Sequence, residues 1–276
     1  MTQTIILAGG IMLGIGAFFG TLLALADRFL KVYEDPRIDA LEEMLPGTNC
    51  GACGQPGCRG FAVSLVAEES APGQCTVSSP EGIETVASFL GVEAGFQEKV
   101  VARLHCAGGT SAVKQLADYH GMSSCRAAFV VNGGGKACPW GCLGLGDCDR
   151  ACDFDAIHMN DESLPVVSVE KCTACNDCVE ICPLDLFALH PVSDKAIVQC
   201  SSPLTGDAAR AICRVTCDGC GLCAADAEPG AIEMTGGLPV INNPQGARKD
   251  CTLRCPTEAI RWVEGDQFDS ETDRHA

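Results

Sequence analysis

The sequence has few basic residues and no nucleotide-binding motif. It contains 19 Lys and Arg against 36 Asp and Glu, a net charge of −17, and this excess of acid argues against nucleic acid, whose phosphates attract basic side chains. No G-x-G-x-x-G follows an expected strand and no G-x4-G-K-[ST] occurs, so nothing indicates a nucleotide on this chain. The acidity is typical of soluble proteins, and its functional alternative is a charged docking face.

Histidine pairs are absent as well, and few cysteines stand outside a run. The five histidines show no two-histidine spacing for zinc or for a Rieske centre. Most of the 21 cysteines fall in tight runs, too close to pair with one another but suited to wrapping one cluster. With 276 residues, 47% of them hydrophobic, the chain has room for one membrane anchor and two or three small domains. Clusters bound by these cysteines would stabilise such small domains.

A long run without charge occupies the N-terminus. Residues 5–26 read IILAGGIMLGIGAFFGTLLALA, 22 residues that can span the roughly 30 Å hydrocarbon layer as one helix. The rival is a cleaved signal peptide, because the run ends in Ala-Leu-Ala, but no basic residue precedes it and it is too long. Arg28, Lys31 and Arg37 follow it, so the positive-inside rule places the rest of the chain in the reducing cytoplasm.

The first cysteine motif follows a polar stalk expected over residues 28–43. The segment LPGTNCGACGQPGCRGFA supplies three cysteines and a fourth lies further along, and four thiolates suit one [4Fe–4S] cluster. Glycines between the cysteines let the backbone turn tightly and offer amide donors to cluster sulfurs. Zinc also takes four thiolates, although the four-residue gap and isolated fourth cysteine fit a cluster better. The expected ligands of this domain, residues 44–80, are Cys50, Cys53, Cys58 and Cys75.

Two further runs predict a two-cluster ferredoxin-like domain over residues 137–192. The second run, KCTACNDCVEICP, has the spacing of bacterial ferredoxins, in which three cysteines of a run bind one cluster and the fourth binds the other. This crossover predicts two sets of ligands. They are Cys138, Cys142, Cys148 and Cys182 for one cluster, and Cys152, Cys172, Cys175 and Cys178 for the other.

A short apolar segment follows each run and recurs as a repeat. Its four copies, each expected to be a short strand, are residues 155–159, 186–189, 231–234 and 259–262. The last two copies predict a second, half-lost module over residues 193–264. One cluster is lost there, because Ala227, Gln245 and Arg248 stand where cysteines would be and leave Cys251 alone. The ligands of the remaining cluster are Cys217, Cys220, Cys223 and Cys255.

The remaining segments carry weaker signals. Residues 81–136 are expected to be a helical connection, with helical spacing of apolar residues over 81–104 and a break near Gly91. The polar tail, residues 265–276, is expected to be disordered. Single cysteines are usually small buried hydrophobes, but four of them are more than chance burial predicts and suggest a fifth cluster. These four are Cys106, Cys125, Cys200 and Cys213.

Together the motifs resemble the B subunit of the Rnf complex, the ion-pumping ferredoxin:NAD oxidoreductase of bacterial membranes. The resemblance covers nearly the whole chain and rests on the anchor, the LPGTNCGACGQPGCRGFA segment, CPWGCLGLGDC and KCTACNDCVEICP, while VQCSSPLTGDAARAIC resembles extended B subunits. It departs at Ala227, Gln245 and Arg248, and at Asp153, where a proline commonly follows the cysteine. The expected fold class is α+β, with a transmembrane helix over residues 1–27, a small iron–sulfur domain and tandem ferredoxin-like modules.

The resemblance implies electron transfer in the bacterial inner membrane. Such a protein would take electrons from reduced soluble ferredoxin and pass them along its clusters, four expected and a fifth hypothesised, towards partner subunits. The flavin and NAD sites would lie on other subunits, so this chain would have no complete active site and no catalytic residue. Two alternatives stay open: a subunit of the related complex that reduces the sensor SoxR, and a membrane-tethered zinc-binding interaction module.

Overall fold

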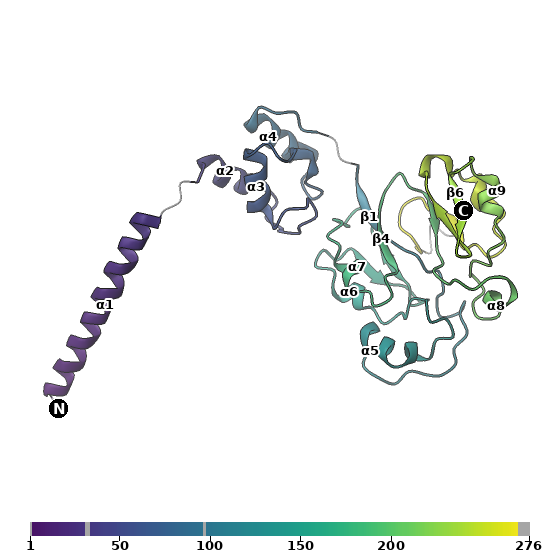
Figure 1. Ribbon diagram of the computed structural model, residues 1–276, viewed down its shortest axis with the longest axis horizontal. Helices are drawn as coiled ribbons and strands as arrows, with labels where there is room; N and C mark the ends of the chain where they lie inside the picture. The colour runs from purple at the N-terminus through teal and green to yellow at the C-terminus, as the bar shows by residue number, and fades with distance from the viewer. Residues whose placement is uncertain (1, 31–33, 96–97, 270–276) are drawn as a thin grey trace.

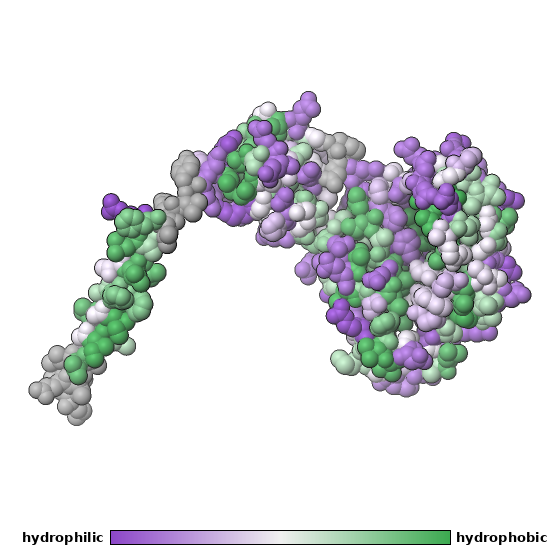
Figure 2. Space-filling model, in the orientation of Figure 1, coloured by the Kyte–Doolittle hydropathy of each residue, from purple (hydrophilic) through white to green (hydrophobic). Residues whose placement is uncertain are grey.

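The computed structural model describes residues 2–30, 34–95 and 98–269. Figure 1 shows a long N-terminal helix, a small helical unit and a larger unit of short strands and helices. Helix α1, Thr2–Leu30, contains the 21-residue span Gly9–Phe29, whose mean hydropathy is 1.9 and none of which is buried. Figure 2 shows its apolar surface, and Met12 and Phe29 are 78% and 80% exposed. By length and composition, α1 can cross a bilayer.

The unit over residues 34–95 consists of helices packed around one apolar core. Its elements are α2 (Pro36–Met44), α3 (Cys58–Val66), the single-turn η1 (Pro72–Gln74) and α4 (Pro80–Leu90). Ile38 and Leu41 of α2 are buried with Phe61 and Val86. The expectation of a polar stalk over residues 28–43 is therefore wrong for residues 36–43, because α2 buries an apolar face in this core.

The larger unit contains the same pair of antiparallel two-stranded sheets twice. Its strands are β1 (Val100–Leu104), β2 (Ile157–Met159), β3 (Pro165–Val167), β4 (Phe187–Pro191), β5 (Ala196–Val198), β6 (Ile232–Thr235), β7 (Leu238–Ile241) and β8 (Ile260–Trp262). In the first copy β1 pairs with β4 and β2 with β3, and in the second copy β5 pairs with β8 and β6 with β7. The four expected strands are confirmed as β2, β4, β6 and β8, and the α+β class is confirmed with them.

Short helices carry many of the cysteines and repeat in the same way. They are α5 (Cys125–Val130), η2 (Asn132–Gly135), α6 (Asp147–Arg150), α7 (Asp177–Ile181), α8 (Gly206–Arg210), α9 (Leu222–Asp226), η3 (Pro244–Gly246) and α10 (Asp250–Leu253). Helix α6 packs against α7 in the first module, and α9 packs against α10 in the second. Each module therefore brings two cysteine-bearing turns together.

Residues 100–104 form a strand, and the expectation of a helix there is wrong. The helix ends at Leu90, where Gly91 adopts a left-handed conformation with φ of 68°. Strand β1 pairs with β4 and is buried on both faces, including Val101, Ala102 and Arg103. Burial on both faces removes the alternation that marks a half-exposed strand. The first module thus begins at β1, and residues 105–146 form an insertion within it.

The C-terminal tail is packed as far as it is described. The Gln267 amide is 2% exposed and binds both backbone groups of Leu104, accepting from its N–H at 2.9 Å and donating to its carbonyl at 2.8 Å. Phe268 joins the apolar core of the first module. The expected disorder is therefore wrong for residues 265–269, because Gln267 satisfies backbone groups at the end of β1. Residues 270–276 lie outside the described residues.

Candidate iron–sulfur sites

The cysteines of the small unit lie in a glycine-rich loop, at the start of α3 and directly after η1. Cys53 interacts electrostatically with Cys50 and Cys75, and Cys53, Cys58 and Cys75 pack against one core. The backbone N–H of Cys58 donates to the Asn49 side chain at 2.8 Å. Gly57 has a φ of 92°, and a Cβ there would lie 2.7 Å from the Asn49 Oδ1 atom, so the turn requires glycine. We name this set the Cys50 group: Cys50, Cys53, Cys58 and Cys75.

The first module holds a second set around one cavity. The cavity is also lined by Phe154, Ile157 and Leu189, which shield it with apolar surface. Burial raises the pKa of Cys178 to about 12 and that of Cys175 to about 11. The buried Thr173 hydroxyl lies in the same cavity, and its interaction with the Cys175 thiol opposes the rise in the pKa of that cysteine. We name this set the Cys172 group: Cys152, Cys172, Cys175 and Cys178.

A third set lies between the first module and its insertion. Asp147 holds the start of α5 beside α6, because its Oδ2 atom accepts from the Ser124 hydroxyl at 3.0 Å and from the Arg126 N–H at 3.1 Å. These bonds bring Cys125, the first residue of α5, next to Cys148, which follows Asp147. Burial raises the pKa of Cys148 to about 12. We name this set the Cys142 group: Cys125, Cys142, Cys148 and Cys182.

A fourth set lies where the two modules meet. Cys106 follows β1, and Cys138 belongs to the insertion. The residue before Cys138 is held by a 3.0 Å hydrogen bond from the Ala137 N–H to the Lys114 carbonyl. Cys200 follows β5 of the second module and Cys213 follows α8. Lys136 and Gln199 line the same cavity. We name this set the Cys106 group: Cys106, Cys138, Cys200 and Cys213.

The structure thus exchanges two cysteines relative to the sequence-based grouping. The ferredoxin pattern predicts that Cys138 lies with Cys142, Cys148 and Cys182, but Cys138 does not line their cavity. Cys125, expected with Cys106, lines that cavity instead. The physical reason is how the insertion of residues 105–146 folds: Asp147 holds Ser124, next to Cys125, beside α6, and the Lys114 carbonyl holds Ala137, next to Cys138.

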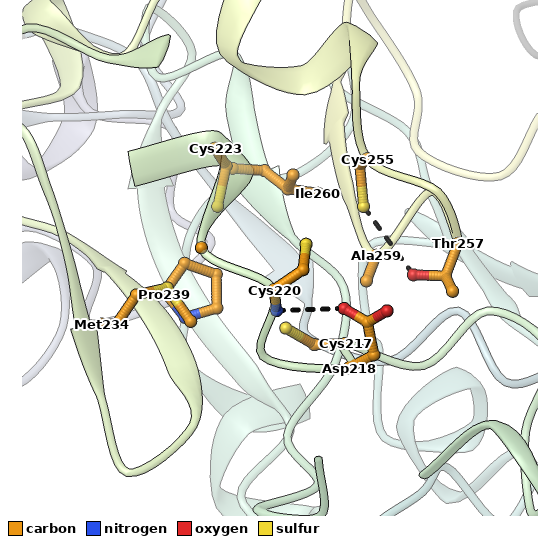
Figure 3. A pocket seen from close by; sticks show the side chains of 11 residues that line it. Cys217, Asp218, Cys220, Cys223, Met234, Pro239, Cys255, Thr257, Ala259 and Ile260 are labelled. Carbon is orange, nitrogen blue, oxygen red and sulfur yellow. Dashed lines mark hydrogen bonds between the residues drawn. The ribbon is translucent and has the colours of Figure 1, made fainter. Parts of the chain in front are cut away.

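The second module holds a fifth set, shown in Figure 3. The four sulfurs face one cavity, which is also lined by Met234, Pro239 and Ile260. The Cys220 N–H donates to the Asp218 Oδ1 atom at 3.1 Å, and Arg210 pairs with the same carboxylate, which holds the pKa of Asp218 below its usual range. We name this set the Cys217 group: Cys217, Cys220, Cys223 and Cys255.

The position of the second cluster in this module is filled by packed side chains. Ala227, Ala247 and Cys251 share one core, and Cys251 is 1% exposed. A Cβ on Gly246 would lie 2.8 Å from the Ala231 Cβ atom, so the backbone there is already in close contact. Arg248 forms an ion pair with Glu228. Cys251 therefore behaves as a small buried hydrophobe.

The cysteine groups have the chemistry of thiolate ligands for a metal cluster. All 21 cysteines are free thiols. Backbone N–H groups already point at several sulfurs, including Cys142 N–H to Cys106 Sγ at 3.2 Å and Ala156 N–H to Cys152 Sγ at 3.4 Å. Such donors tune the reduction potential of a bound cluster. Within residues 2–30, 34–95 and 98–269, no three His, Cys, Asp or Glu side chains converge closely enough for a single metal ion.

Known proteins match both the small unit and the whole chain. A family model described as "Putative Fe-S cluster" matches residues 45–77, which contain the Cys50 group. The B subunit of the ion-translocating oxidoreductase complex of Methanosarcina acetivorans is 34% identical over 261 residues, covering 94% of this chain and 99% of that relative. The chain belongs to this B-subunit family.

Two further B subunits agree with that assignment. The one from the proton-translocating ferredoxin:NAD(+) oxidoreductase complex of Clostridium ljungdahlii is 37% identical, covering 95% of this chain and 93% of that relative. The one from the Na(+)-translocating ferredoxin:NAD(+) oxidoreductase complex of Acetobacterium woodii is 40% identical over 79% of this chain and 65% of that relative. An iron–sulfur cofactor in this chain is supported by the family model and by the cysteine content.

Sequence reasoning did not single out three residues that shape the sites of this protein. Asp147 brings Cys125 to its partners, and Lys136 and Thr173 place polar groups in two cysteine-lined cavities. Thr173 and Asp147 carry the same weak signal, because each lies directly beside a motif cysteine. The contacts of Asp147 and Lys136 depend on how the insertion folds, which local spacing does not encode.

Proposed function

We propose that this protein is an electron carrier that holds five [4Fe–4S] clusters, one in each cysteine group. It would accept electrons from reduced ferredoxin and relay them towards partner subunits that reduce NAD, the activity named for its Clostridium and Acetobacterium relatives. The observation that carries this proposal is that 20 of 21 cysteines gather in five groups of four. The bound clusters would supply one-electron chemistry at low potential.

The donor set supports a cluster over zinc. Zinc needs its four ligands about 2.3 Å from one point, whereas these thiols line the walls of cavities and do not converge on a single ion position among the described residues. The buried Thr173 hydroxyl suits a cluster, since it lies beside the Cys175 thiol and would donate to a sulfur in that cavity. The zinc module therefore gains no support, and none of the three relatives is named for SoxR reduction.

The chain's own residues would bind, orient and shield the clusters. Apolar side chains such as Ile157 and Leu189 keep water from the Cys172 group, and backbone N–H groups donate to the sulfurs. Helix α1 would anchor the chain in the bacterial cytoplasmic membrane. Arg28 in its last turn supports placing all five groups on the cytoplasmic side.

Iron and sulfide counting on anaerobically purified protein tests this function. Five clusters require about 20 iron atoms per chain, a brown colour, and absorbance that bleaches with dithionite. A content of about 16 iron atoms per chain would mean that one of the five groups holds no cluster. A colourless protein that contains zinc would overturn it.

A further inference from the structure

The Cys106 group draws its cysteines equally from the two modules. Cys106 and Cys138 belong to the first module and its insertion, and Cys200 and Cys213 belong to the second module. Backbone bonds hold the two sides together, from the Ala107 N–H to the Gln199 carbonyl at 2.9 Å and from the Lys114 N–H to the Ile212 carbonyl at 2.9 Å. The group therefore lies in the interface between the modules.

A direct contact leads from this group into the first module. The backbone N–H of Cys142 donates to the Cys106 Sγ atom at 3.2 Å. One hydrogen bond thus joins a residue of the Cys142 group to a sulfur of the Cys106 group. The Cys142 group in turn lies beside the Cys172 group, because Cys148 interacts electrostatically with Cys178.

A second contact leads into the other module. The Cys200 Sγ atom lies 3.6 Å from the Thr216 Oγ1 atom, and that hydroxyl donates to the Cys217 carbonyl at 3.4 Å. Thr216 is buried, so water does not compete for these contacts. The Cys106 group is thus joined by short polar contacts to one cysteine group on each side.

Lys136 places a positive charge at the first of these contacts. Its ammonium lines the Cys106 cavity and donates to the Gly108 carbonyl at 2.8 Å and to the Cys142 carbonyl. Burial raises the pKa of Cys106, and Lys136 together with backbone N–H donors from Cys142 and Gly108 opposes that rise. A fixed cation stabilises the more negative, reduced form of a nearby cluster and so raises its reduction potential.

We propose that the Cys106 group is the site that couples the two ferredoxin-like modules electronically, with Lys136 as the charge that sets its reduction potential. This inference rests on the proposed function. One electron passes at each step, so the site that donates is oxidised as its neighbour is reduced, and the first electron comes from reduced ferredoxin. The Cys217 group then has the Cys106 group as its neighbour in the series.

The coupling is tested with Cys213→Ala, with Cys251→Ala as the matched control. Both are buried cysteines of the second module, but Cys251 belongs to no group. Iron content and electron paramagnetic resonance spectra are measured on full-length protein reduced with dithionite. Cys213→Ala should lose the iron of one cluster, and the signal of the Cys217 group should lose its magnetic coupling, while the Cys142 and Cys172 signals stay coupled to each other. Cys251→Ala should keep all iron and all couplings.

Lys136→Gln tests the charge while all five groups keep their cysteines. Glutamine retains donors for the two carbonyls but carries no charge, Lys136→Arg retains the charge, and Lys114→Gln removes a charge from an exposed position. In redox titrations, Lys136→Gln should move one midpoint potential to more negative values with unchanged iron. Lys136→Arg and Lys114→Gln should remain close to the unmodified chain.

Several outcomes would overturn the coupling proposal. One is full iron content or an unchanged Cys217 signal in Cys213→Ala, and another is an iron-complete Lys136→Gln protein with all midpoints unchanged. If Cys213→Ala also removes clusters from neighbouring groups, the Lys136 variants test the proposal instead. The cluster whose midpoint potential moves in Lys136→Gln must then be one whose signal is coupled to that of the Cys217 group, and a shift in an uncoupled cluster would overturn the proposal. An unmodified chain that contains no clusters would instead overturn the proposed function.

Discussion

Thr173 places a buried hydroxyl beside the Cys175 thiol in the cavity of the Cys172 group. Replacing it with valine keeps the shape and removes the donor, so we expect the reduction potential of the Cys172 group to fall. A hydrogen bond contributes about 1 kcal/mol, which corresponds to roughly 40 mV for one electron. Redox titration followed by electron paramagnetic resonance measures the shift. Thr173→Ser keeps the hydroxyl and should leave the potential unchanged, and an unchanged potential in Thr173→Val would contradict this role.

Cysteine spacing predicts which cysteines come together in some groups but not in others. In the Cys172 and Cys217 groups, which each take three members from one run, the expected four cysteines line one cavity. In the Cys50 group, Cys53, Cys58 and Cys75 pack against one core, and Cys53 interacts electrostatically with Cys50. The exchange of Cys138 and Cys125 depends on Asp147, which accepts bonds from the start of α5 across 21 residues or more. Such a contact leaves no local pattern in the sequence, and so the grouping of these two cysteines had to come from the structure.

Strand β1 depends on the tail segment that follows β8. Gln267→Ala would leave the N–H and carbonyl of Leu104 buried without partners, so we expect a loss of about 2–4 kcal/mol in unfolding free energy. Thermal unfolding of the iron-loaded protein under argon measures this loss as a lower midpoint temperature. The control is Gln245→Ala, because Gln245 is exposed in η3. Equal midpoints for the two variants would show that the Gln267 bonds contribute little.

The strands that follow a cysteine run were predictable, and the strands that pair with them were not. Strands β2, β4, β6 and β8 each follow a cysteine run, so the repeat identifies them. Strand β1 has no preceding cysteine run and is buried on both faces, so its short apolar sequence matches a helix pattern equally well. The Gln267 contact joins residues 163 positions apart, which explains why a polar tail gave no sign of packing.

Loading of the whole molecule should depend on pH, because burial holds the thiols in their neutral form. The pKa of Cys138 and Cys217 is raised to about 11, and that of Cys148 and Cys178 to about 12. Each thiol must release a proton to bind iron, so cluster uptake should become more favourable as the pH rises towards these pKa values. Reconstitution with iron and sulfide at about pH 7 and about pH 9 measures this, and equal or lower uptake at the higher pH would contradict it.

The same pKa values predict the opposite trend for the stability of the cluster-free fold. Between about pH 9 and about pH 11 the unfolded chain releases thiol protons that the folded chain retains. Stability should therefore fall as pH rises through this window. The bound clusters hold their ligands as thiolates, so denaturant titrations of the loaded protein should not show this loss.

The shared origin of the Cys106 group has a consequence for how the protein matures. Two of its cysteines follow β1 and lie in the insertion, and the other two follow β5 and α8, so the cavity is complete only when the second module has docked on the first. The other groups are each complete within one module or its insertion. A cell that inserts clusters as the chain folds would therefore fill this cavity only after the second module has docked, and a chain that ends before Cys200 would carry the Cys142 and Cys172 groups with no route into a second module.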